Sequence, residues 1–302
     1  MSSTTDPLQI QVPRSLTALL QLLQLLVGRE GHRRWCGGVV PREKLEGFVV
    51  KMSARYPVAR NARGRAYDRK RGLAVVHLVC YPVDEGVAWW LLSSEGKGGL
   101  ADPGAPDAHV ARDAMSAQHH IEFGDYVLLY ATKRAPRRVL DKKAGKERTV
   151  ASSLSTWTWK LRASVVKELK ASIETECRTL QYGEDVGKGW GLRGLLGRQR
   201  RRPLFSGVRN QVIELHRFAR DSWARYRTTW LSQHARFIKR YGDKAGSLMP
   251  MNEMMSRHLP TMPRLKVYDD PPVRLVDLCG APEIVPRAET GAVCRTDEPA
   301  CT

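Results

Sequence analysis

The amino-acid sequence predicts an α+β fold. A small antiparallel sheet built from two hairpins, in the order ββα-ββ, is expected between an N-terminal helical pair and a long basic C-terminal helical hairpin. Two pairs of segments rich in β-branched and aromatic residues predict the hairpins. Apolar residues at helical spacing on both sides of them predict the helices. The 302 residues, of which 42% are hydrophobic, are enough for a buried core.

Two helices are expected before the first hairpin. Apolar residues recur at helical spacing from Leu16 to Leu26, and Ser15 precedes them as a plausible N-cap. A second helix is expected from Arg42 to about Arg55, because Pro41 suits a helix start and an apolar stripe follows it. The residues in front of both helices read as a flexible lead.

The two hairpins follow in the chain. The first pairs Leu73–Tyr81 with Val87–Ser93, and a short helix around Ala108–Gln118 comes after it. The second hairpin pairs Asp125–Lys133 with Val150–Leu161 across a basic connector. Side chains repeat every two residues along a strand, so Trp157 and Trp159 share one face of that sheet. They could stack on unpaired bases, but core packing is the more ordinary expectation.

The C-terminal half is expected to be helical and then irregular. Ser164–Tyr182 predicts a helix, a Gly/Arg-rich connector follows, and a long helix runs from about Ser206 to Tyr241. The expected organisation is therefore a flexible lead (1–14), a helical pair with the antiparallel sheet (15–163), a basic helical hairpin (164–245) and an irregular, partly disordered acidic tail (246–302).

Charge is the unusual property of this chain. Fifty Lys and Arg against 31 Asp and Glu give a net charge of +19 and a pI near 10.0, which indicates a polyanionic partner. Lys51–Arg71, Lys133–Arg148 and Lys188–Arg240 carry net charges of +7, +6 and +12, so the charge is concentrated. Arginine outnumbers lysine, and its planar fork suits phosphates and bases.

The arginines expected to contact nucleic acid fall in two of these basic segments. In the expected long helix, Arg209, Arg220 and Arg227 lie within about 20° of one another at the edge of an apolar stripe. The alternative is a solvated helix face. The full set of candidate nucleic-acid-binding residues is Arg60, Arg63, Arg65, Arg69, Arg71, Arg198, Arg200, Arg201, Arg202, Arg209, Arg220 and Arg227.

Catalytic motifs give little support for an enzyme. The chain contains no GxxxxGK[ST], GxSxG or HExxH, and no cofactor is expected. If the protein is a nuclease, His216 or His32 is the candidate general base, acting without a metal ion. His119 and His120 with Glu122 could hold a metal, but no second ligand cluster accompanies them, so we expect no metal site.

The leading functional hypothesis is a cytoplasmic protein that binds DNA or RNA, as an accessory protein of a bacterial mobile element. Arginine-rich loops and a helix would contact phosphates rather than base edges. Protein subunits of a larger nucleoprotein complex are further expected partners, and a membrane is not. One alternative is a metal-independent RNA endonuclease that processes stem-loop guide RNA. Another is a non-catalytic assembly subunit that binds an acidic protein.

Overall fold

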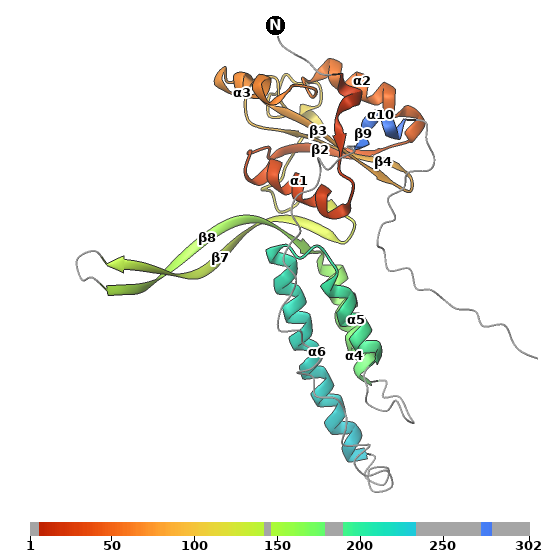
Figure 1. Cartoon of the computed structure of the whole chain (residues 1–302), viewed down its shortest axis with the longest axis vertical. Helices are drawn as coiled ribbons and strands as arrows, with labels where there is room; N and C mark the ends of the chain where they lie inside the picture. Colours follow the sequence, from red (N-terminus) through yellow and green to blue (C-terminus); the bar gives the residue numbers. More distant parts are fainter. Residues whose placement is uncertain (1–5, 142–145, 179–189, 234–272, 280–302) are drawn as a thin grey trace, which may run out of the picture. The chain divides into compact units, whose positions relative to one another are not determined.

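The computed structural model describes residues 6–141, 146–178, 190–233 and 273–279, without the side chains of 133–154 and of a few α6 residues. The chain divides into two units. The first contains the described residues up to His119 together with 273–279, and the second contains those from His120 to Gln233 (Figure 1). Several small antiparallel sheets and helices make up these units, so the expected α+β class is confirmed.

The first unit is built on a four-stranded antiparallel sheet. Its strands are β2 (Arg34–Val40), β3 (Val76–Val83), β4 (Gly86–Ser93) and β5 (Arg112–Asp113), in the order β3-β4-β2-β5. The hairpin β3–β4 is the first of the two expected from the sequence. Strand β2 was not expected, because two consecutive glycines interrupt its apolar pattern. A Cβ at Gly37 would lie 2.7 Å from a carbonyl oxygen of β4, so glycine allows this pairing.

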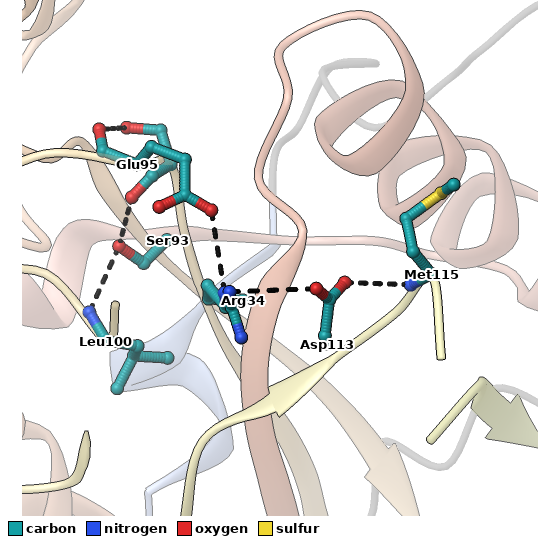
Figure 2. Close-up of polar contacts among 7 residues, drawn as sticks. Arg34, Ser93, Glu95, Leu100, Asp113 and Met115 are labelled. Carbon is teal, nitrogen blue, oxygen red and sulfur yellow. Dashed lines mark hydrogen bonds and ion pairs between the residues drawn. The ribbon is translucent and has the colours of Figure 1, made fainter. Parts of the chain in front are cut away.

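The short helix that we expected over residues 108–118 does not form, and the two residues of strand β5 lie in the middle of this segment, followed by turns. Only a 3₁₀ turn, η3 (Ala108–Val110), is helical there. The guanidinium of Arg34 on β2 lies between two carboxylates, at 3.5 Å from Glu95 and 3.7 Å from Asp113 on β5 (Figure 2). These ion pairs and the β2–β5 hydrogen bonds hold the segment extended, and the sequence pattern did not contain this tertiary contact.

The expected N-terminal helical pair is present. Helix α1 spans Leu16–Gly28, and the Ser15 hydroxyl accepts a hydrogen bond from the backbone at its start. A 3₁₀ turn, η2 (Arg42–Lys44), leads into α2 (Leu45–Arg55). A third helix, α3 (Ala62–Lys70), lies in the segment that we had read as a basic loop. A core cluster of this unit includes Val40, Leu45, Val49, Tyr56, Val76, Leu78, Val87 and Leu91.

A C-terminal segment completes the first unit. Strand β9 (Val273–Arg274) pairs with β1 (Gln11–Val12), which follows the 3₁₀ turn η1 (Pro7–Gln9). Helix α10 (Leu275–Leu278) follows directly, and both of its leucines are buried. Residues 273–279 are thus ordered within the first unit, although the sequence placed them in an irregular tail.

The second unit has its own antiparallel sheet, so the expectation of one sheet built from both hairpins is wrong. Its strands are β6 (Ile121–Phe123), β7 (Tyr126–Asp141) and β8 (Lys146–Leu161), in that order. In the first unit β2 occupies the open edge of β4, so the second hairpin does not pair there. The β7–β8 pairing continues from Tyr126 opposite Leu161 to Asp141 opposite Lys146, so most of the expected connector is strand.

The described residues of this unit also form three helices: α4 (Ala163–Arg178), α5 (Trp190–Arg200) and α6 (Ser206–Gln233). Helices α4 and α6 were expected, and they pack together; the end expected for α6, residues 234–241, lies outside the described residues. Helix α5 was not expected, because glycines break its apolar pattern. No helix in the described part of the chain is long and apolar enough to cross a bilayer.

One side chain ties α6 to the last strand of the sheet. The amide of Gln211 accepts a hydrogen bond from the backbone of Leu161 at 2.7 Å and donates one back at 3.0 Å. Trp157 and Trp159 on β8 are 5% and 0% exposed, and the Trp159 ring lies 6.4 Å from that of Phe205. Both tryptophans are therefore core residues, and no stacking surface for bases is left on them.

Candidate nucleic-acid interface

Helix α3 presents an exposed basic and aromatic face. Asn61 caps its start by accepting a hydrogen bond from a backbone N–H at 2.8 Å. Arg63, Tyr67 and Lys70 then follow at i, i+4 and i+7, which places them on one side of the helix. All three are exposed, and the Tyr67 ring is 57% accessible. The guanidinium of Arg71 lies 5.6 Å from the centre of that ring.

No carboxylate that the structure describes neutralises this face. Among the described residues, neither Arg63 nor Lys70 forms an ion pair. We call Arg63, Tyr67, Lys70 and Arg71 the α3 face. Exposed cations beside an exposed ring combine phosphate contact with base stacking. Of the arginines expected here from the sequence, Arg63 and Arg71 belong to this surface.

The remaining candidate arginines around α3 are half-buried or paired with a carboxylate. The Arg60 guanidinium lies 3.2 Å from the carboxylate of Asp68, which is 3% exposed, so this pair is part of the packing of α3. Arg69 lies 3.1 Å from Glu30 in the turn after α1. Arg65 is half-buried, and its charge lies close to the buried His32 and the half-buried His77. These three candidates hold α3 in place in the described structure.

The two histidines beside Arg65 form a cluster with Glu30. The rings of His32 and His77 meet edge to face, with centroids 4.7 Å apart. His32 is 0% exposed, and burial lowers its pKa. Burial and the charge of Arg65 lower the pKa of His77 from 6.5 to about 2. Both rings are therefore neutral at physiological pH, and His32 has no access to a substrate in solution.

The second unit presents basic residues where α5 meets α6. Arg198 and Arg201 are exposed and form no ion pair with any described residue, whereas Arg200 is half-buried. Arg202 is held by a 2.7 Å contact with Asp125 and a 2.6 Å hydrogen bond with Gln199. Through these bonds Arg202, which precedes α6, connects the end of α5 to the turn between β6 and β7.

The expected arginine row on α6 is only partly exposed. Arg209 is half-buried, and Arg220 is exposed but lies 2.9 Å from the carboxylate of its neighbour Asp221. The side chain of Arg227 lies outside the described residues. Arg217, which the sequence reading did not select, is exposed and has no ion pair with a described residue. Its position on α6, directly after His216 and one turn before Arg220, was visible in the sequence.

His216 lies on the inner side of this row. It is 4% exposed, and its Nε2 atom has no hydrogen-bond partner among the described residues. Burial, followed by the charge of Arg200, lowers its pKa. A general base must reach the proton that it removes, and neither His216 nor His32 presents a ring to solvent. The described geometry therefore gives no support to either as a catalytic residue.

The candidate residues belong to two different units, with the α3 set in the first and the α5–α6 set in the second. Comparison with known proteins returned no matching family model, no matching curated protein and no matching solved structure.

Proposed function

We propose that this chain binds nucleic acid, DNA or RNA, mainly through phosphate contacts. The observation that carries the proposal is the α3 face, in which Arg63, Lys70 and Arg71 accompany an exposed tyrosine and form no ion pair with a described acid. Phosphate contacts need accessible cations, and an accessible ring next to them adds stacking on a base. The net charge of +19 favours the approach of a polyanion.

Arg198, Arg201 and Arg217 of the second unit would add further phosphate contacts. They share with the α3 face the properties that distinguish a binding arginine from a packing arginine: the guanidinium is exposed and no acid of the described structure pairs with it. Arg60, Arg69 and Arg202 lack the second of these properties, because each one is paired with a carboxylate. The arginines that we propose to contact phosphates are therefore fewer than the candidates that the sequence suggested.

A binding titration with salt tests the proposal. Fluorescence anisotropy with labelled single strands and duplexes of DNA and RNA should give a log–log salt slope of several units, about −0.7 to −0.9 for each phosphate contacted. Replacing Arg63 and Lys70 together with glutamine should reduce the slope by about 1 to 2 units. Tyr67→Ala should cost about 1–3 kcal/mol for single strands and less for duplexes, which hide the faces of their bases.

A matched control separates the α3 face from net charge. Arg33 and Lys44 are exposed cations of the same unit, and replacing both with glutamine removes the same charge. This control should weaken binding much less than the Arg63 and Lys70 pair. Equal losses would reject the α3 face as the binding surface. If the unchanged protein failed to bind any of the four probes at low salt, nucleic-acid binding itself would be rejected, and an acidic protein partner would replace it.

A further inference from the structure

The cluster of Glu30, His32 and His77, in which His32 is buried and the other two are half-buried, contains two polar atoms that form no hydrogen bond with a described residue. The Nε2 atoms of both histidines are inaccessible, and neither has a hydrogen bond within the described residues. Leaving a buried polar atom unsatisfied costs about 1–3 kcal/mol. Two such atoms in neighbouring rings, whose centroids are 4.7 Å apart, indicate that one bound ligand could satisfy both nitrogens.

The hydrogen bonding of His32 shows which chemical form its Nε2 takes. Its Nδ1 lies 3.1 Å from the carbonyl oxygen of Leu26, near the C-terminal end of α1. A carbonyl oxygen can only accept, so Nδ1 carries the hydrogen. In a neutral imidazole the Nε2 atom then has an unprotonated lone pair. Metal-binding histidines show this arrangement, with one nitrogen donating to a carbonyl and the other binding the ion.

Glu30 adds an oxygen to the two nitrogens. The chain turns between Glu30 and His32 at Gly31, whose φ of +77° suits glycine. A Glu30 carboxylate oxygen lies 3.8 Å from Nε2 of His77, and the ligand atoms of all three residues lie within 4.8 Å of one another. Ligands about 2.0–2.1 Å from a tetrahedral zinc ion lie about 3.3 Å apart, so modest side-chain rotations would complete the site.

We propose that Glu30, His32 and His77 bind a Zn²⁺ ion, with water or an anion in the fourth position. Two imidazoles and one carboxylate are a ligand set that zinc takes in proteins. The ion would link the end of α1 to β3 and satisfy both unpaired nitrogens. It would also displace Arg69 from Glu30; the Arg69 side chain is 46% exposed and can turn outward.

Metal titration of the full chain tests this site. After removal of metal with a chelator, calorimetry should show one Zn²⁺ bound per chain at this site. Cobalt bound in its place should absorb in the visible region without a thiolate-to-cobalt charge-transfer band, because none of the three ligands is a cysteine. That spectrum distinguishes the cluster from the chain's six cysteines. Binding only with a thiolate band would overturn the proposal.

Substitutions assign the ligands. Glu30→Gln should weaken zinc binding by about tenfold or more. Even the loss of a residue that only hydrogen-bonds to a metal ligand lowers metal affinity by about 10–100-fold. Glu95→Gln is the matched control. Glu95 also pairs with an arginine of this unit, but it is not one of the three residues of the cluster. Arg69→Gln should strengthen zinc binding about two- to fivefold by removing the competing ion pair.

Two controls distinguish a loss of zinc binding from misfolding of the variant, and a bound zinc ion from a buried water molecule. Circular dichroism and the melting temperature of each metal-free variant report whether it folds, and His77→Gln serves as a second ligand variant. A buried water could also satisfy the two nitrogens, but it would give no zinc-dependent rise in melting temperature. No zinc binding by the folded protein, or equal binding by the Glu30→Gln and Glu95→Gln variants, would overturn the proposal.

Discussion

The short helix α10 should contribute a large share of the stability of the first unit. Leu275 and Leu278 are 0% and 1% exposed, and the Leu275 N–H donates to the Ile10 carbonyl at 3.0 Å. Fully burying a leucine stabilises by about 1.5–3 kcal/mol, so the two leucines account for about 3–6 kcal/mol. A whole domain is stable by only about 5–15 kcal/mol. Removing residues 273–302 should therefore strongly destabilise or unfold this unit.

Two truncations and one pair of point variants make the test specific. Truncation after Cys279 keeps β9 and α10, so its urea unfolding midpoint should match that of the full chain. Leu275→Ala should cost about 2–5 kcal/mol. Val276→Ala on the same helix should cost less than about 0.5 kcal/mol, because Val276 is 37% exposed. An unchanged midpoint after truncation at residue 272 would refute the reasoning.

Two further predictions concern the second unit. The folded protein binds a proton on His216 less readily than the unfolded chain, whose pKa is near 6.5. Stability should therefore fall as the pH drops below 6.5, by at most about 1.4 kcal/mol per pH unit, and denaturation of His216→Leu at pH 5 and pH 7 should show less of this dependence. Arg202→Met should cost about 1–3 kcal/mol, because it breaks the contacts with Asp125 and Gln199. The Arg202→Met variant should bind nucleic acid with the same affinity as the unchanged protein at a temperature where both are folded. A loss of affinity as large as that of the Arg63 and Lys70 double variant would contradict the assignment of Arg202 as a packing residue.

Local sequence patterns predicted the elements whose stability is local. Helix α2 has an apolar stripe after a proline, and the hairpin β3–β4 has β-branched strands around a turn. Strand β2 escaped prediction because Gly37 and Gly38 interrupt its pattern, while its pairing depends on the distant β4. Helix α3 has no apolar stripe and depends on its N-cap and on two ion pairs, one between its Arg69 and Glu30 and one between its Asp68 and Arg60.

The same limit applies to the candidate site. The sequence located the basic segments, but which arginines are available depends on acids elsewhere in the chain, and Asp125 is 77 residues from Arg202. His32 is followed in the sequence by Arg33 and Arg34, a pattern that suits a general base beside phosphate-binding residues. Its actual neighbour is His77, which reaches it from β3, and no spacing rule relates the two. Tertiary pairing therefore separates the residues that we propose to bind phosphates from those that pack, and composition alone does not.

The two proposals meet at Arg69, and this gives them a testable link. Glu30 pairs with Arg69 in the described structure, and the same carboxylate is a proposed zinc ligand. Zinc binding would release the Arg69 guanidinium on α3, where it could contact a phosphate. By thermodynamic reciprocity, nucleic acid should then strengthen zinc binding by the same factor. We expect a two- to fivefold effect, roughly the strength of an exposed ion pair. Arg69→Gln should abolish the coupling, and Arg63→Gln should preserve it while weakening the binding of nucleic acid. Coupling of equal size in both variants would show that the link does not run through Arg69.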